Sequence, residues 1–295
     1  MTATNQFHKI QILLPAKIFI ALTVLFSGVV LQAAVVFKSL NSSITTSATA
    51  IQGGLLLGMT EPGNTVWLDK NKVKVASDGS FIIGFGRSTL NAELKVLSKV
   101  GVEEIQTIEV QSREYKIDRI DGLPPSKVNP KGDAVLKRIK AESLLVKQAR
   151  KTNHPRQAFK EGFIWPAKGR ISGVYGSQRI LNGEPKWPHF GLDIAAATGA
   201  DVIAPVSGIV TLVHNDMYYS GGTLIIDHGQ GLSSTFLHLS EILVKEGQTI
   251  EKGSLIAKVG ATGRVTGAHL DWRINWFRIR LDPQLLVDGI SQDAR

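Results

Sequence analysis

The sequence predicts a mostly β protein built from two β parts joined by a helical linker. Short apolar runs alternate with turn signals from about residue 51 to 112, and they return after Phe163 between frequent glycines. Between these stretches, apolar residues recur at near-helical spacing from Asp133 to Arg150. We therefore expect a small antiparallel, sandwich-like β domain at 38–120, a linker with a basic helix at 121–158, and an antiparallel β domain at 159–290.

Composition restricts the classes of function. Hydrophobic residues make up 43% of the 295 positions and charged residues 20%, which excludes a wholly disordered chain. The absence of cysteine excludes disulfides, thiolate metal sites and a cysteine nucleophile. The net charge of +9 favours a polyanionic partner such as an acidic cell-wall polymer, anionic lipid or nucleic acid. No RRM, helix-turn-helix or zinc-finger signature supports nucleic acid, so we expect none to bind.

The N-terminus has the pattern of an export signal. Lys9 and Lys17 precede the uncharged run Ile18–Phe37, which is 20 residues long. A basic start before an apolar stretch is typical of a secretory signal, here with cleavage near Ala33 or Ala34, but this run is also long enough to span a bilayer as an anchor. A buried core helix is the remaining alternative. We expect 1–37 to be a signal peptide or membrane anchor, the only membrane contact, with the rest of the chain in the periplasm or cell envelope.

The first β part offers turns but no catalytic cluster. Asp78-Gly79 separates the strand-like runs Lys72–Val75 and Phe81–Ile83, which is a hairpin signal. No constellation of catalytic side chains accompanies these runs, so we expect this part to act in spacing or docking.

A break at Asp121–Pro125, with paired prolines, precedes the predicted helix. Its apolar stripe contains Leu136, Ile139, Val146 and Ala149, with lysines and arginines between them. We interpret it as a solvated linker helix packed by one stripe, although a basic helix can also touch an anionic surface.

The second β part contains four strand-like runs divided by glycine-rich turns. No long helical period intervenes, which argues for an antiparallel all-β domain. The predicted strands are 201–204, 208–213, 222–226 and 255–259.

Five of the seven histidines lie between residues 189 and 269. His189 and Asp193 are four residues apart, and on a straight strand they would lie roughly 13 Å from each other, too far to share one ion. The chain must therefore bend between them, which Gly191 permits. As a bare spacing this pair is a weak signal.

His269-Leu270-Asp271 is a stronger signal, because residues two apart on a strand face the same side. Leu270 would enter the core while His269 and Asp271 share a groove. His238 ends another strand-like run. Histidine and carboxylate ligands with further histidines nearby are the composition of a zinc hydrolase site, although spacing alone leaves structural roles open.

Three ordered segments, HFGLDI, IIDHGQGLSSTFLHLS and TGRVTGAHLDWRI, resemble the LytM/lysostaphin-like M23 peptidases over residues 164–288. The resemblance implies an antiparallel β domain with zinc in an open groove and hydrolysis of peptide bonds in peptidoglycan. Peptidoglycan stem peptides are then the expected partner.

The resemblance also implies residue roles. His189 and Asp193 match the first two zinc ligands, and His238 and His269 match the two catalytic histidines that do not bind zinc. The third ligand, a histidine in the family, falls at Asp271. Aspartate is an acceptable zinc ligand, although two carboxylates lower the formal charge of the site to neutral, and the same set would accept other divalent ions.

Two functions remain open at this point. The first is an exported zinc metalloendopeptidase that cleaves peptidoglycan cross-links. The second is a degenerate domain in which Asp271 marks the loss of zinc, since family members without zinc ligands regulate amidases; a cell-envelope regulatory protein would then be a partner. Retention of the other four motif positions favours the enzyme.

The remaining polar residues near the motifs receive simpler interpretations. We expect Arg179 to line the groove and meet an anionic substrate. His228 is expected to be a turn or supporting residue, and His214 a surface residue. The tryptophans near the motifs are expected to serve in packing rather than as stacking platforms; they are Trp187, Trp272 and Trp276.

Overall fold

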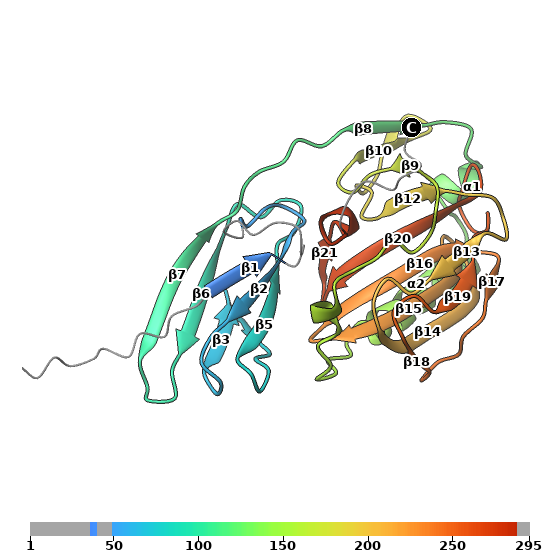
Figure 1. Ribbon diagram of the computed structural model, residues 1–295. Coiled ribbons are helices and arrows are strands. Elements are labelled where there is room, and N and C mark those ends of the chain that lie inside the picture. The colour runs from blue at the N-terminus through green and yellow to red at the C-terminus, as the bar shows by residue number, and fades with distance from the viewer. Residues whose placement is uncertain (1–35, 40–48, 288–295) are drawn as a thin grey trace, which may run out of the picture. The chain divides into compact units, whose positions relative to one another are not determined.

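The computed structural model describes residues 36–39 and 49–287, all of which belong to one compact unit (Figure 1). The predicted signal peptide or anchor at 1–37 lies almost wholly outside the described residues. Among the described residues, no helix is long and apolar enough to cross a membrane.

The first β part consists of two small antiparallel sheets, which confirms the predicted β domain. One sheet has the strand order β1-β2-β5 and the other the order β4-β3-β6-β7. On β3 and β6 every second residue is buried, so one face of this sheet points into a core with Phe81 and Ile83 of β5. The strands are β1 (Val36–Ser39), β2 (Leu55–Met59), β3 (Thr65–Leu68), β4 (Asn71–Val73), β5 (Ser80–Gly84), β6 (Asn91–Leu97) and β7 (Glu103–Glu109).

The expected hairpin at Asp78-Gly79 is wrong. Strand β4 pairs with β3, whereas β5 pairs with β2, so this turn carries the chain from one sheet to the other. The Asp78 carboxylate accepts hydrogen bonds from the backbone N–H and hydroxyl of Ser80, and Gly79 has φ +84°. Asp78-Gly79 therefore forms a turn, as its residue types predict, but tertiary packing decides which strands pair.

The linker contains the predicted helix, α2 (Asp133–Ala149), preceded by the short helix α1 (Pro125–Val128). Strand β8 (Ile117–Ile120), at the end of the predicted first domain, pairs in parallel with β10 (Gln178–Leu181) of the second part. The expected apolar stripe is half right: Ala149 is buried against Leu212, Met217 and Ile225, with Val146 beside it. By contrast, Leu136 is 49% exposed.

The second β part is dominated by an eight-stranded antiparallel sheet, as predicted. The strand order is β18-β14-β15-β16-β20-β12-β9, with β21 paired to β20, and α2 contacts β14 (Figure 1). These strands are β9 (Arg170–Gly173), β12 (Leu192–Ala195), β14 (Gly208–Met217), β15 (Gly221–Gly229), β16 (Leu232–Leu239), β18 (Thr249–Ile250), β20 (His269–Trp276) and β21 (Ile279–Leu281).

Smaller elements complete this part. A second sheet has the order β13-β19-β17, and β10 also pairs with the short strand β11. Their bounds are β11 (Glu184–Pro185), β13 (Asp201–Ile203), β17 (Glu241–Ile242), β19 (Leu255–Lys258), η1 (Ala158–Glu161) and η2 (Pro283–Leu285). All four strands expected from the glycine-rich pattern are present.

Candidate metal centre

Strands β12 and β20 bring two carboxylates together. Asp193 lies directly opposite Asp271 in the antiparallel register, so both side chains leave the same face of the sheet. On β20 the fully buried Leu270 enters the core, as expected, while His269 and Asp271 share the opposite face. The alternation of one strand and the register of one pair therefore build half of the site.

His189 reaches the carboxylates because the chain bends before β12 begins at Leu192. Its backbone N–H donates to the Ser177 carbonyl at 2.8 Å, and its own carbonyl accepts from Gly176 N–H at 2.7 Å. This anchoring places His189 Nε2 3.0 Å from Asp193 Oδ1 and 3.5 Å from Asp271 Oδ2.

Two glycines make room for the carboxylates. A Cβ on Gly191 would lie 2.1 Å from Asp271 Oδ1, and one on Gly173 would lie 2.3 Å from Asp193 Oδ2. Real Cβ atoms do not approach other atoms so closely, so any side chain at either position would displace a carboxylate. Gly191 therefore does more than permit the bend: it also leaves space for Asp271.

The donor set fits a divalent cation. One ligand atom from each of His189, Asp193 and Asp271 lies within 4.8 Å of the other two. His189 Nε2 and Asp193 Oδ1 lie 3.0 Å apart but are not aligned as a hydrogen bond, and His189 Nδ1 also lacks a hydrogen-bond partner among the described residues; all three atoms are buried. Buried polar atoms are rarely left unpaired, so these atoms are suited to hold an ion. One imidazole and two carboxylates suit zinc with one coordination position open, and they also accept other divalent ions.

Each carboxylate of this metal cradle, defined as His189, Asp193 and Asp271, also contacts an arginine. Arg273 donates from Nε to Asp271 Oδ1 at 2.9 Å and from Nη2 to Oδ2 at 2.6 Å, which is a bidentate pair. Arg179 makes one longer contact, from Nη2 to Asp193 Oδ2 at 3.3 Å.

These contacts set the charge of Asp271. Burial opposes its ionisation, but the positive charges of Arg273 and His189 outweigh burial and hold the pKa of Asp271 well below its usual range. Asp271 together with Arg273 is then formally neutral, as a neutral histidine would be. From the sequence, we expect two carboxylates to lower the formal charge of a zinc site to neutral. Arg273 changes this expectation, because its positive charge offsets the second carboxylate.

His238 and His269 lie side by side next to the cradle, with ring centroids 4.9 Å apart. The Nδ1 atom of His238 is 2.8 Å from the Thr262 carbonyl, and that of His269 is 2.9 Å from the Gly267 carbonyl. Since a carbonyl can only accept, both Nδ1 atoms carry a proton, and Nε2 is the nitrogen of each ring that holds the lone pair in the neutral tautomer.

The environment favours the neutral form of His238. Burial lowers the pKa of His238 to about 4. Its backbone has φ +66°, an unusual value for a residue other than glycine, and strained residues of this kind cluster at functional sites. The Nε2 of His269 lies 3.8 Å from Asp193 Oδ1. The pair therefore presents two imidazoles beside the cradle.

The other residues selected from the sequence have varied surroundings. His228 is fully buried and bonds through its two nitrogens to the Ser207 carbonyl and the Ser234 hydroxyl, away from the cradle. His214 lies on β14 and is half-buried. Trp272 is fully buried and Trp276 nearly so, as packing residues are, whereas Trp187 is 82% exposed.

Sequence reasoning missed Arg273, although a signal for it existed. Residues 271 and 273 are two apart on one strand and so face the same side, by the argument applied to His269 and Asp271. It also missed Gly173, because the role of this glycine depends on its approach to Asp193 of β12, which no local pattern marks.

Comparison with known proteins agrees with this geometry. Residues 187–283 match the family model described as Peptidase family M23, and all three cradle residues and both neighbouring histidines fall inside that range. This chain carries an M23 peptidase domain. The crystal structure of a Pseudomonas aeruginosa protein assigned to M23 is similar over 82% of this chain and 97% of its own, with a TM-score of 0.64 and 28% identity.

Curated relatives fall into two groups. The peptidoglycan DD-endopeptidase ShyA of Vibrio cholerae is 41% identical over 109 residues, which cover 37% of this chain and 25% of ShyA. The murein hydrolase activator NlpD of Escherichia coli is 32% identical over 99 residues, 34% of this chain and 24% of NlpD. The M23 domain of this chain thus spans about a quarter of each of these relatives, of which one is an enzyme and the other an activator.

Proposed function

We propose that this protein is a zinc metalloendopeptidase that acts outside the cytoplasm on the peptide cross-links of peptidoglycan. The observation that carries the proposal is the metal cradle, whose buried His189 and Asp193 atoms lie beside the imidazoles of His238 and His269. The similarity to ShyA supports the substrate class. The basic start and apolar run within 1–37 support export to the periplasm or cell envelope.

The roles of the residues follow from their protonation and position. His189, Asp193 and Asp271 would hold the ion, and zinc when bound supplies a Lewis acid that polarises the scissile carbonyl. His238 and His269 present Nε2 lone pairs, so this pair can take the proton of the attacking water and return it to the leaving amine. Once the Nε2 of either imidazole has taken up a proton, it can donate a hydrogen bond that stabilises the oxyanion.

Arg273 adapts the aspartate ligand to this task. Because Asp271 and Arg273 cancel in charge, the cradle has the net charge of a set with two neutral imidazoles and one carboxylate. A cation with fewer compensating charges acidifies water and polarises a carbonyl more strongly. The exchange of histidine for aspartate is therefore compatible with hydrolysis in this chain.

One observation favours a second function, a non-catalytic regulator of wall hydrolysis. The two carboxylates and the two arginines, Arg179 and Arg273, balance one another without any cation. A domain of this kind would bind a wall enzyme or peptidoglycan and keep the M23 fold only as a scaffold. The similarity to NlpD is consistent with this alternative.

Two measurements on one preparation separate these functions. The metal content of freshly purified protein is measured, and the protein is then incubated with peptidoglycan, whose fragments are separated by chromatography. We expect one zinc ion per chain, with loss of cross-linked fragments and gain of uncross-linked ones. Absence of both metal and product would refute the enzyme and leave the regulator.

The Asp271→His variant gives a sharper test of the same point. If product forms with this variant but not with the natural protein, then the natural aspartate silences the site and the proposal is wrong. If the natural protein is active, we expect the variant to lose activity, because Arg273 would then add an uncompensated positive charge next to the ion.

A further inference from the structure

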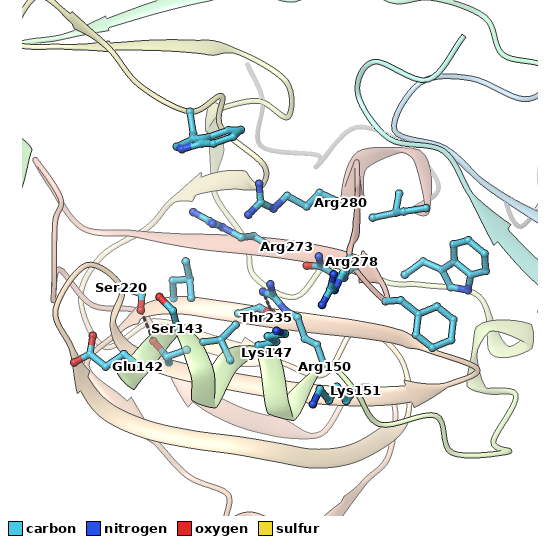
Figure 2. Close-up of a pocket in the computed structure, with 18 of the residues that line it drawn as sticks. Glu142, Ser143, Lys147, Arg150, Lys151, Ser220, Thr235, Arg273, Arg278 and Arg280 are labelled. Carbon is cyan, nitrogen blue, oxygen red and sulfur yellow. Dashed lines mark hydrogen bonds between the residues drawn. The ribbon is translucent and has the colours of Figure 1, made fainter. Parts of the chain in front are cut away.

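A large cavity lies between α2 and the face of the eight-stranded sheet that carries the metal centre. Its volume is about 1290 Å³, and residues 68–72 line part of it as well. Figure 2 shows Arg150 reaching into it from α2, while Arg273 of β20 and Arg280 of β21 enter from the other side. His238 lines the same cavity, so it adjoins the metal centre.

The lining is strongly cationic. Ten of the lining residues are lysine or arginine, and two, Asp69 and Glu142, are acidic. Glu142 is already engaged by Arg138 and by the backbone N–H of Tyr218, and Asp69 accepts from the backbone N–H of Glu93. Arg179 and Arg273 are paired with the cradle carboxylates, but the lysines and arginines of the lining still clearly outnumber its acidic residues.

Three N–H groups in the lining are buried and have no acceptor. They are Arg150 Nε, Arg179 Nε and Trp276 Nε1. Among the described residues, every buried lining atom in this condition is a donor, whereas the metal cradle has unpaired acceptors. A ligand rich in acceptors would satisfy these groups, and a buried donor left unpaired is unfavourable.

The arginines also destabilise one another. Burial, together with the charges of Arg273 and Arg280, lowers the pKa of Arg150 to about 9. Burial and the charge of Arg273 likewise lower the pKa of Arg280. An anion placed among them would relieve this repulsion, so the site is better suited to a negative ligand than to an empty state.

We propose that this cavity binds a free carboxylate of the peptide substrate, with Arg150 and Arg280 as its principal cationic contacts. The inference deepens the proposed function and rests on it for the identity of the ligand. Arg273 and Arg179 each contact a cradle carboxylate and also line the cavity, so a bound carboxylate would lie close to the reacting bond. The protein would then prefer peptide substrates that carry acidic groups beside the cleaved bond.

The test uses the full chain, treated with a chelator so that no cleavage occurs, and isothermal titration calorimetry at low salt. The probe is a peptidoglycan stem peptide with free carboxylates, and its twin carries carboxamides in their place. We expect the carboxylate peptide to bind at least about tenfold more tightly than the twin, since hydrogen bonds to charged groups are the stronger kind.

Two variants locate the site. Arg150→Gln and Arg280→Gln are each expected to weaken binding of the carboxylate peptide about tenfold and to leave binding of the twin unchanged. Lys140→Gln is the matched control, because it removes one charge from the exposed side of α2, outside the cavity lining, and should change nothing. Arg150 bonds to Thr235 at 2.8 Å, so its variant is checked by thermal unfolding, and Arg280→Gln keeps the test decisive if that variant does not fold.

The proposal fails if peptide and twin bind equally, or if both arginine variants bind as the natural protein does. It also fails if an oligonucleotide of equal charge binds as tightly and depends on the same arginines, because the cavity would then sense charge alone. These results are distinct from failure of the proposed function. The protein could bind the carboxylate peptide through Arg150 and yet hold no zinc and release no fragments. In that case the carboxylate site would be supported, and the proposed enzyme function would be refuted.

Discussion

The metal cradle and the adjoining cavity differ in the kind of buried atom that lacks a hydrogen-bond partner. In the cradle the unpaired buried atoms are those of His189 and Asp193, whereas in the cavity they are N–H donors of arginine and tryptophan. One region is prepared for a cation and its neighbour for an anion. Arg273 and Arg179 belong to both, since each neutralises a cradle carboxylate and also faces the cavity. The two regions are therefore electrostatically coupled, and a change of charge in one should alter ligand binding in the other.

The largest expected effect comes from removing a cradle ligand. His189→Ala should lower zinc affinity more than about 100-fold, beyond the usual loss from a supporting residue, because one of three protein ligands disappears. Competition with a zinc chelator measures the affinity, and carboxylate-peptide binding in the cavity should persist. His214→Ala is the control, since His214 lies on β14 outside the cradle. Stoichiometric, tight zinc in His189→Ala would contradict the ligand assignment.

Next in size is the loss of the shared arginine. Arg273→Gln removes the bidentate partner of Asp271, which is 1% exposed and would keep only its contact with His189, so the metal-free protein should lose about 3 kcal/mol of unfolding free energy. Zinc affinity should rise about tenfold, because a competing positive charge is gone. Denaturant unfolding with and without zinc measures both effects. If zinc stabilises the variant no more than the natural protein, Arg273 does not compensate the charge of the second carboxylate.

A smaller effect is expected from the glycine beneath Asp271. Gly191→Ala places a Cβ against the Asp271 carboxylate and should weaken zinc binding about 10- to 100-fold, as other displaced ligands do. Gly267→Ala is the matched control, because a Cβ there meets no atom within 4 Å and its φ is not positive. Equal zinc affinity in the two variants would show that Asp271 can move without affecting the ion.

The smallest effect concerns pH. Burial lowers the pKa of both His228 and His238 to about 4, from an ordinary value of 6.5. The unfolded chain therefore takes up protons first as pH falls, so stability is complete above about pH 6.5 and declines toward pH 4. The slope is up to about 1.4 kcal/mol per pH unit for each imidazole.

Denaturant unfolding of metal-free protein at several values between pH 7 and 4.5 measures this slope. His228→Asn should remove about half of it, because His228 is buried away from the cradle and His238 would remain. A stability that does not change over this range would mean that neither imidazole is held neutral by the fold.

Part of the site was predictable from local pattern, whereas the expected roles of His189, Asp193 and His238 came from the resemblance to M23 peptidases. Alternation on one strand placed His269 and Asp271 together, and the need for a bend placed Gly191 between His189 and Asp193. The strands of the second β part and helix α2 also follow directly from apolar spacing and glycine turns.

The features that escaped prediction depend on which strands meet. The Asp78-Gly79 turn has hairpin chemistry, yet it joins two sheets because β4 and β5 find other partners. The basic helix was expected to be mainly solvated, but Arg150 at its end bonds to Thr235 of β16, 85 residues away. Long-range pairing of this kind leaves no periodic signal in the sequence.

The position of α2 has a consequence for protein engineering. The family match begins at residue 187, so the helix that supplies Arg150 lies outside the shared domain. Of the two principal cationic contacts proposed for the cavity, Arg150 is thus encoded outside the matched range and Arg280 inside it. Exchanging the helical segment between M23 proteins should therefore change the strength of carboxylate binding while leaving the proposed metal ligands and the two neighbouring histidines in place.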